Sequence, residues 1–560
     1  MWLSPLQPTA ADDPNRAMVT IRRWNARASN SRGMNMGTNS RSRLINRCGR
    51  QVAGITVGSL LAIAPALGRS PQAQATPLCP AELAPAINQI VDRPEFQRFR
   101  WGIAVETLNG EPGDRRQLYA HQADRYFLPA SVAKLITTAA ALAELGANYR
   151  IPTTISALPS HPNSTALTLQ VVGRGDPSLT RADVQNLAQQ LGDRGVTHID
   201  HVILNDRFFP GHSVNLNWEW EDVQAGYGAA ASSFILDENE IVMDLIPQGL
   251  GEPLAVAWRD PAQGDRWQLD NRSRTVPTDA PEFVQVGRDL GEPLVWIEGH
   301  LRVGSPSEDA SISVPDPTAN FGAQLQQAMT TVGLTVPPVT PVDTYEATHG
   351  LAIALPAARD RRGELARVES APVAELIAIA NQRSTNIYAE ALLRHLGQRE
   401  AIAPNLNHLN ALSSADATAA GLAVIPSILA PLGVDAATYQ LADGSGLSRH
   451  NLVSPTALVQ TLQAMAAHPE AAVYRDSLAV MGARGTLAYR FQDTAIAGRF
   501  WGKSGTISGN ASLAGYLELP DAPPLAIAIL LNQTTLSGRE MRGAIDMVLA
   551  EIARVRSCAP

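Results

Sequence analysis

The two lysines of this sequence are the residues whose type and spacing most clearly indicate chemistry. Lysine is rare here, since the 560 residues include 43 arginines and only two lysines. Lys134 follows Ser131 by three positions, and Lys503 begins the sequence Lys-Ser-Gly-Thr. Arginine keeps its proton in proteins, whereas burial or a nearby cation can convert lysine to the neutral amine. Lys134 is therefore predicted to act as a base.

A helix that begins at Ser131 is expected to bring Ser131 and Lys134 together. Pro129 precedes this segment, apolar residues recur at helical spacing over 132–142, and Gly146 is a suitable C-terminal stop. Residues three apart on a helix share a face, so Ser131 Oγ and Lys134 Nζ can lie within hydrogen-bonding distance. A serine with a base at that distance can lose its proton and act as a nucleophile.

A second polar group, Ser384-Thr385-Asn386, lies between two helical patterns at 371–380 and 387–396. A serine and an asparagine two residues apart in such a short break can direct their side chains into the same cleft. The tripeptide is too common to indicate a function by itself. Its value comes from its place in the order of three motifs along the chain.

That order, Ser-x-x-Lys, Ser-x-Asn and then Lys-Ser-Gly, resembles the motifs of the penicillin-recognising serine acyl-transferases. The long segment between Ser131 and Ser384 resembles the class C low-molecular-mass penicillin-binding proteins, the D-alanyl-D-alanine carboxypeptidase/endopeptidase family, which carry extra domains there. Segments 173–179, 443–449 and 485–487 also look like that family, and the resemblance covers residues 78–556. The third motif departs from the commoner Lys-Thr-Gly, but its serine keeps the hydroxyl.

The resemblance implies a role for each residue of the first two motifs. Ser131 would attack the carbonyl of the penultimate D-alanine, giving an acyl-enzyme that water hydrolyses, and neutral Lys134 would take its proton. Burial and the nearby Lys503 cation would both lower the pKa of Lys134. Ser384 would return a proton to the leaving amine, and Asn386 would hold the amide of the substrate.

The third motif would bind the end of the substrate. Lys503 and the hydroxyls of Ser504 and Thr506 would hold the terminal carboxylate. Gly505 would permit a close approach, and the backbone N–H groups of Thr506 and of the nucleophilic serine would form the oxyanion hole. An edge strand over 499–507 is expected to present these groups to the cleft.

The fold that the resemblance implies is an α+β multidomain, penicillin-binding/β-lactamase-like serine transpeptidase fold, with an antiparallel sheet flanked by helices and inserted β-rich domains. The catalytic domain would comprise 76–160 and 346–560, with the insertion at 161–345, where short β-like runs dominate. Strands of the sheet are expected at 99–108, 117–119, 499–507, 512–519 and 524–531, and helices at 455–467, behind Ser454 as N-cap, and at 541–555.

The N-terminal segment 1–75 has the pattern of a leader with a signal peptide. Arginines precede an apolar run at 52–67, and Ala73-Gln74-Ala75 follows as a cleavage signal. Cleavage is expected near Ala75, and a retained anchor is the alternative. The protein is predicted to be exported to the periplasmic or cell-wall compartment of a bacterium.

The cysteines agree with export. Removal of the signal also removes Cys48 and leaves Cys79 and Cys558 near opposite ends of the mature chain. An even count in an exported protein predicts a disulfide between them, which requires both ends to lie on one domain. Lipid attachment at Cys79 is the alternative, although the preceding Thr76-Pro77-Leu78 lacks the small residues that a lipobox needs.

Composition excludes several classes of partner. The net charge is −8 and the arginines are scattered, which gives no basic surface for nucleic acid. His198 and His201 have no further ligands nearby in the sequence and are expected on the surface, so neither a metal nor an organic cofactor is predicted. The expected partners are peptidoglycan stem peptides ending in D-Ala-D-Ala and β-lactam inhibitors, and the oligomeric state is left open.

Three functions are compatible with the motifs. The predicted one is a serine D-alanyl-D-alanine carboxypeptidase/endopeptidase, whose two activities share an acyl-enzyme and are not separated by the motifs. A β-lactamase shares the acylation chemistry, but the long insertion argues against it. The third is a non-catalytic penicillin-sensing or cell-wall-binding protein, and the complete set of polar groups argues against that function.

Overall fold

The computed structural model describes residues 76–108, 115–158, 167–398 and 416–558. All of these residues lie in one compact unit. The predicted leader, its cleavage signal and Cys48 lie outside the described residues. Within the described ranges, the search for a helix of membrane-spanning length and apolarity found none.

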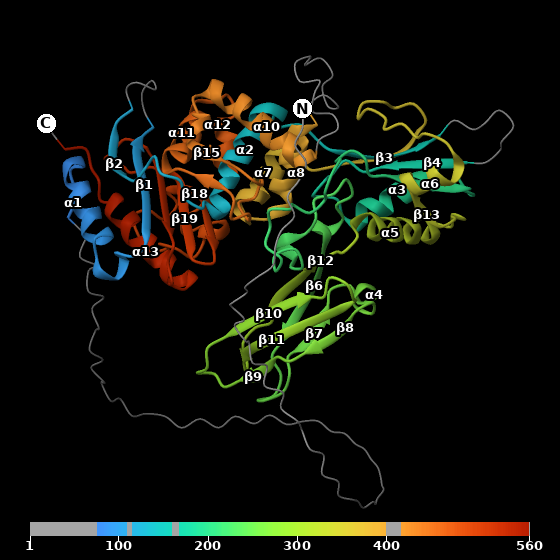
Figure 1. Ribbon diagram of the computed structural model, residues 1–560, viewed down its shortest axis with the longest axis horizontal. Helices are drawn as coiled ribbons and strands as arrows, with labels where there is room; N and C mark the ends of the chain where they lie inside the picture. The colour runs from blue at the N-terminus through green and yellow to red at the C-terminus, as the bar shows by residue number, and fades with distance from the viewer. Residues whose placement is uncertain (1–75, 109–114, 159–166, 399–415, 559–560) are drawn as a thin grey trace, which may run out of the picture. The chain divides into compact units, whose positions relative to one another are not determined.

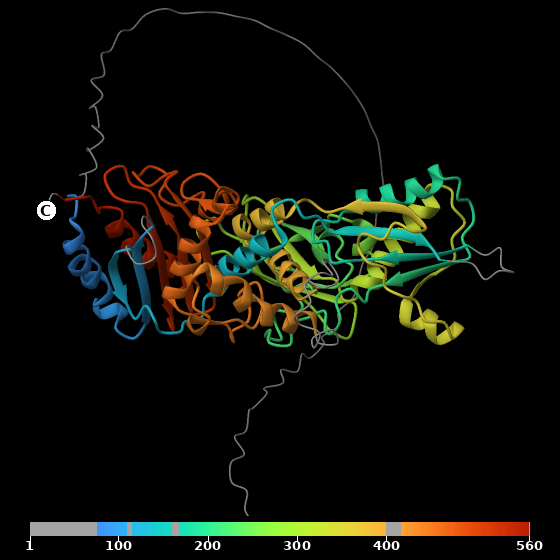
Figure 2. The same ribbon diagram turned by 90° about the horizontal axis from the view of Figure 1, so that it is seen from above.

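A six-stranded antiparallel sheet carries the third motif on β18, with the strand order β17-β18-β19-β20-β1-β2 (Figure 1). β1 pairs with β20 along its whole length, so the first and last parts of the described chain form one sheet (Figures 1 and 2). The strands are β1 (Arg100–Thr107), β2 (Gln117–His121), β17 (Ala479–Val480), β18 (Phe500–Ile507), β19 (Asn510–Leu517) and β20 (Leu525–Asn532).

The apolar residues of β20 belong alternately to two cores. Successive side chains of a strand point to opposite faces, so an uninterrupted apolar strand needs a helical layer on each face. Ala526, Ala528 and Leu530 pack into one core, and Ile527, Ile529 and Leu531 pack into the other. The sheet is therefore the middle layer of a helix–sheet–helix arrangement.

The second of these cores is covered by α1 (Pro80–Val91) and α13 (Gly538–Ile552). Helices from the middle and the C-terminal part of the chain cover the first core. They are α2 (Lys134–Leu145), α7 (Val373–Gln382), α8 (Asn386–Gly397), α10 (Ala417–Leu429), α11 (Pro455–Ala467) and α12 (Ala471–Asp476). A two-stranded ribbon, β15 (Tyr439–Gln440) with β16 (Leu452–Val453), precedes α11.

Part of the inserted segment is a mixed α/β unit. Its sheet has the order β13-β5-β4-β3-β14, and α3 (Arg181–Asp193) and α5 (Pro317–Thr331) pack against it in a separate core. The strands are β3 (Pro152–Ala157), β4 (Thr168–Val172), β5 (His201–Asn205), β13 (Val339–Pro341) and β14 (Glu364–Glu369), and α6 (Val342–His349) follows β13.

The remainder of the insertion forms strands around a further apolar core. Two sheets contribute, β12-β6-β7 and a second one in which β11 pairs with β8, β9 and β10. The elements are β6 (Glu240–Ile246), β7 (Ala255–Trp258), α4 (Pro261–Gly264), β8 (Gln268–Asn271), β9 (Arg274–Val276), β10 (Phe283–Arg288), β11 (Leu294–Arg302) and β12 (Glu308–Ser313).

The insertion differs from its sequence description in two respects. It contains the helices α3 and α5, whose apolar residues are spaced three and four apart between the short strands. Its α/β sheet also includes β3 and β14, which lie outside the predicted bounds of 161–345. A strand joins a sheet through its backbone hydrogen bonds, so sequence texture alone did not assign β3 and β14 to the inserted unit.

The two ends of the described chain are joined covalently. The structure has a disulfide between Cys79 and Cys558, with 5.5 Å between the Cα atoms and 479 residues between the cysteines in sequence. Beside it, Leu78 N donates to Arg554 O at 2.9 Å, and Arg556 N donates to Leu78 O at 2.9 Å. The bond therefore connects α1 and α13, the two helices on one face of the sheet.

We predict that Cys558→Ser lowers the free energy of unfolding by about 2–5 kcal/mol, because the disulfide restricts the unfolded chain over a very long loop. Chemical denaturation under non-reducing conditions measures the change, with reduced wild-type protein as the matched control. Intact mass should rise by about two daltons on reduction, as expected when one bond between two cysteines takes up two hydrogens. An unchanged mass on reduction would contradict this prediction.

Candidate active site

Ser131 lies in a tight turn immediately before α2. Residues Ala130–Ala133 form a 3-10 turn, and the α-helix begins at Lys134, three residues later than the sequence analysis placed it. Ala130 has φ +49°, a backbone conformation that L-residues rarely adopt. The strained turn leaves Ser131 Oγ 3.1 Å from Lys134 Nζ, so the expected pair is brought together.

Lys134 is completely buried, and its amine contacts three oxygen atoms. Besides Ser131 Oγ, Nζ donates to Asn386 Oδ1 at 2.7 Å and to the carbonyl oxygen of Ser445 at 2.8 Å. Asn386 is the first residue of α8, whereas Ser445 belongs to the segment 443–449 that resembles the family. The amine is thus fixed by three separate parts of the chain.

The second motif occupies the break between α7 and α8, as expected. Ser384 has φ +66°, which turns the chain sharply before α8. Its Oγ accepts a hydrogen bond from Lys503 Nζ at 2.8 Å, while Asn386 Nδ2 donates to the carbonyl oxygen of Tyr227 at 2.8 Å. The second and third motifs therefore meet through Ser384 and Lys503.

The third motif lies on β18, which was expected to be an edge strand. β17 lies outside it but pairs only with Trp501 and Gly502. From Lys503 onward β18 extends beyond β17, so this part of the strand borders the cleft. The part of β18 that carries the motif is therefore an edge strand, as expected, whereas Trp501 and Gly502 are paired with β17.

The side chains of the third motif point in different directions. Lys503 is completely buried and Thr506 is exposed. Ser504 Oγ donates to Thr486 Oγ1 at 2.9 Å, so its hydroxyl is already engaged with a residue outside the motif. Thr486, Ser445 and Tyr227 were not among the expected site residues, although Thr486 and Ser445 lie in the segments singled out for their resemblance to the family.

Gly505 allows β18 to approach the Ser131 turn. A Cβ atom at this position would lie 2.5 Å from Ser512 Oγ and 2.7 Å from the backbone nitrogen of Ser131. Real Cβ atoms do not approach other atoms so closely. Only glycine therefore permits this packing of the strand against the turn.

The two buried lysines have lowered pKa values. Burial lowers the pKa of Lys134 to about 8, and the carboxylates of Asp443 and Glu390 oppose this shift because they favour the ammonium form. Burial lowers the pKa of Lys503 well below its usual value, and the charge of Lys134 lowers it further. The two amines therefore repel each other's positive charge, and at Lys134 two nearby carboxylates have the opposite effect.

A cavity of about 680 Å³ opens beside these residues. It contains charged groups of both signs, and Arg449 pairs at its rim with Glu219 at 2.7 Å. Lining residues from the three motifs are Ser131, Ser384, Asn386 and Thr506, and those from the insertion include Glu219, Glu221, Asp222, Tyr227 and residues 284–286.

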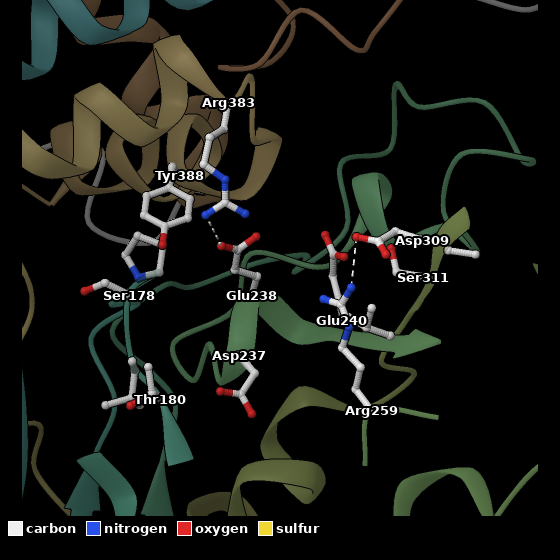
Figure 3. A pocket seen from close by; sticks show the side chains of 14 residues that line it. Ser178, Thr180, Asp237, Glu238, Glu240, Arg259, Asp309, Ser311, Arg383 and Tyr388 are labelled. Carbon is white, nitrogen blue, oxygen red and sulfur yellow. Dashed lines mark ion pairs between the residues drawn. The ribbon is translucent and has the colours of Figure 1, made fainter. Parts of the chain in front are cut away.

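A second cavity, of about 420 Å³, is lined by Arg383, the residue that precedes Ser384 (Figure 3). Four of its six charged side chains form two ion pairs, Arg383 with Glu238 at 3.6 Å and Arg259 with Asp309 at 2.9 Å. The first pair links the break before α8 to the insertion, and the second lies within the insertion. Residues of all three motifs line the larger cavity, not this one.

The described residues contain no group of three or more histidine, cysteine, aspartate or glutamate side chains that could hold a metal ion. His198 lies 3.5 Å from Asp200 in an exposed pair.

Strand β18 with its Lys-Ser-Gly sequence packs against a Ser-x-x-Lys turn, and helices cover both faces of the sheet. This combination of fold and site defines a serine peptidase of the penicillin-recognising class. A comparison with protein-family models gives the particular family: the chain belongs to the D-Ala-D-Ala carboxypeptidase 3 (S13) family, whose model matches residues 83–552. The predicted family and fold class are confirmed, and the protein is a serine-type D-alanyl-D-alanine carboxypeptidase.

Individual relatives agree with this assignment. The chain is 30% identical over 511 residues to a D-alanyl-D-alanine carboxypeptidase of Actinomadura sp. (strain R39), covering 88% of both chains. It is 23% identical to the D-alanyl-D-alanine carboxypeptidase DacB of Haemophilus influenzae, covering 73% of this chain and 81% of that one. The crystal structure of penicillin binding protein 4 (dacB) from Haemophilus influenzae matches the fold with a TM-score of 0.65 at 21% identity, covering 83% of this chain and 99% of that one.

We predict that Gly505→Ala lowers the rate of penicillin acylation by about a hundredfold or more, because the added methyl group displaces β18 from the Ser131 turn. Acylation kinetics measured by intact mass test this. Gly543→Ala is the matched control, since a Cβ at Gly543 meets nothing within 4 Å. Equal rates for Gly505→Ala and wild type would show that the close packing is not needed.

Proposed function

We propose that the protein cleaves peptidoglycan stem peptides ending in D-Ala-D-Ala through an acyl-enzyme on Ser131, with Lys134 as the general base. The observation that carries this proposal is the set of contacts around Lys134 Nζ. Two of its three neighbours, Asn386 Oδ1 and Ser445 O, are carbonyl oxygens, which only accept hydrogen bonds. The third is the hydroxyl of Ser131.

A neutral lysine amine fits these contacts. Its two N–H groups donate to the two carbonyl oxygens, and its lone pair then faces the proton of Ser131 Oγ. A pKa lowered to about 8 leaves part of the amine neutral near neutral pH. Lys134 is thus held in the orientation in which it can remove the serine proton without first moving.

Acylation follows from this arrangement. The Ser131 proton passes to Lys134 while Oγ forms a bond to the carbonyl carbon of the penultimate D-alanine. Backbone N–H groups of Ser131 and Thr506 stabilise the oxyanion, and the bond to the terminal D-alanine nitrogen then breaks. The leaving nitrogen takes up a proton through Ser384, and a water molecule later hydrolyses the ester and frees Ser131.

Lys503 would bind the terminal carboxylate of the substrate. Without substrate, repulsion from Lys134 and burial disfavour its charged form. A bound carboxylate reverses this, since an opposite charge beside an amine raises the pKa of that amine. Substrate binding would therefore place the positive charge on Lys503 and leave Lys134 as the neutral base.

The charges that line the large cavity favour a peptide substrate that has both an amino group and a carboxylate. Glu219, Glu221 and Asp222 can attract an amino group, and Arg449 can attract a carboxylate. A free stem peptide and a cross-linked one offer the same D-alanyl carbonyl to Ser131. We therefore propose both carboxypeptidase and endopeptidase activity at one site.

We further propose that the protein acts outside the cytoplasmic membrane, in the periplasmic or cell-wall compartment of a bacterium. The signal-peptide pattern before Thr76 supports export. The disulfide between Cys79 and Cys558 supports an oxidising compartment, because such bonds are rare in the cytosol.

The assignment of Ser131 is tested by labelled penicillin. We expect a stable adduct that peptide mapping locates on Ser131 and that Ser131→Ala lacks, whereas Ser427→Ala, changed on α10, keeps it. Rapid turnover of the drug would instead indicate a β-lactamase. No adduct and no turnover would favour a non-catalytic binding protein.

The acylation rate is expected to rise with pH through about 8, because the pKa of Lys134 is about 8 and only its neutral form removes the serine proton. Below that pH the rate should fall about tenfold per pH unit. Stopped-flow acylation by a chromogenic β-lactam measures the profile. A rate independent of pH across this range would contradict the role of Lys134 as base.

A further inference from the structure

Glu390 is a buried carboxylate that does not line the large cavity, although it lies one helical turn after Asn386 on α8. Its side chain is 1% exposed. Oε1 accepts two backbone hydrogen bonds, from Gly444 N at 3.0 Å and from Ser445 N at 2.8 Å. A buried carboxylate with backbone donors fixes the position of the loop that supplies them.

That loop is the one that contacts Lys134. The carbonyl oxygen of Ser445 accepts from Lys134 Nζ at 2.8 Å. The loop also presses against the Ser131 turn, because a Cβ on Gly446 would lie 1.9 Å from the carbonyl oxygen of Ala130. A shift of the loop would therefore move the base and the nucleophile turn together.

Helix α8 positions both carbonyl oxygens that accept hydrogen bonds from Lys134 Nζ. Residues four apart on a helix lie on the same face. Asn386 binds Lys134 directly, and Glu390 binds it through Ser445. One helix thus sets the positions of both carbonyl oxygens that orient the amine.

We propose that Glu390 is a positioning residue for the reaction: its carboxylate holds the Ser445 carbonyl against Lys134 and supplies the negative charge that tunes the proton affinity of that amine. This inference rests on the proposed role of Lys134 as base, and it adds the residue that controls it.

Charged groups surround Glu390 on each element that packs against it. Lys134 faces it from α2, Asp443 from the loop and Arg394 from α8 itself. Arg394 Nη2 donates to the carbonyl oxygens of His212 and Ser213, at 2.8 and 3.0 Å. The hydrogen bonds from Ser445 and the charge of Arg394 favour the ionised form of Glu390, whereas Asp443 disfavours it.

The other carboxylate near Lys134 differs from Glu390. Asp443 accepts from four nitrogen donors, the backbone N–H groups of Gly446 and Ser448, Asn451 Nδ2 and Trp218 Nε1. These donors tie Asp443 into the loop, whereas Glu390 Oε1 accepts from two backbone N–H groups. Burial and the Asp443 charge raise the pKa of Glu390 to about 7, so the charge of Glu390 varies in the working pH range.

The chain allows a direct test, because it has only two lysines and labelling with [13Cε]lysine yields two signals. Glu390→Gln keeps an oxygen for the loop N–H groups but removes the charge. We expect the pKa of Lys134 in this variant to fall by about one pH unit, because the carboxylate favours the ammonium form. The variant Lys503→Arg keeps only the Lys134 signal and so assigns both signals. The acidic limb of the acylation profile should move to lower pH by the same amount.

Two further variants separate position from charge. Glu390→Asp keeps the charge but withdraws it from the loop, so the plateau acylation rate should fall about ten- to a hundredfold while the acidic limb stays in place. Glu375→Gln, on the exposed side of α7, removes a carboxylate away from the loop and should change neither.

The inference fails if Lys134 titrates identically in Glu390→Gln and wild type, or if Glu390→Gln alters only thermal stability. If Glu390→Gln does not fold, the wild-type protein still tests the inference. The Lys134 signal should show a second inflection near pH 7, where Glu390 titrates. Absence of this inflection would overturn the inference. An adduct that persists in Ser131→Ala would instead overturn the proposed function and leave the lysine titration unaffected.

Discussion

The site depends on the burial of an amine whose donors are all satisfied by oxygen atoms of the protein. A lysine without water loses its preference for the charged form, and a buried amine without acceptors would destabilise the fold. Lys134 is completely buried, and α8 and the loop after β15 each supply a carbonyl oxygen that accepts a hydrogen bond from its amine. These two elements hold the amine beside the Ser131 hydroxyl, and β18 packs against the same turn.

The insertion contributes to this arrangement, although it lies between the first two motifs in sequence. Asn215 Nδ2 donates to the carbonyl oxygen of Ala442 at 2.8 Å, and Trp218 Nε1 donates to Asp443 Oδ2 at 2.9 Å. Tyr227 accepts from Asn386 at its backbone oxygen. The inserted residues therefore form one wall of the cavity and also hold the loop that contacts Lys134.

Local patterns were enough to predict the motifs and most elements of the catalytic domain. The helix at 455–467 with Ser454 as N-cap was predicted with the bounds that the structure has, because capping is encoded within a few residues. Glu390 could not be found in this way, since its partners lie more than fifty positions further along the chain. Burial, one of the two expected causes, is the main cause of the lowered Lys134 pKa. The two opposing carboxylates, Asp443 and Glu390, were not foreseen because they are neighbours of Lys134 only in space.

The pairing of β1 with β20 means that the central sheet cannot be completed until the last strands have been synthesised. A ribosome makes Ser131 hundreds of residues before β18 and the strands that follow it. Until those final strands arrive, the nucleophile has no partner strand, and the cysteine at the end of the chain has not yet closed the molecule. A chain that stops before β18 therefore lacks both Lys503 and the strand that packs against the Ser131 turn.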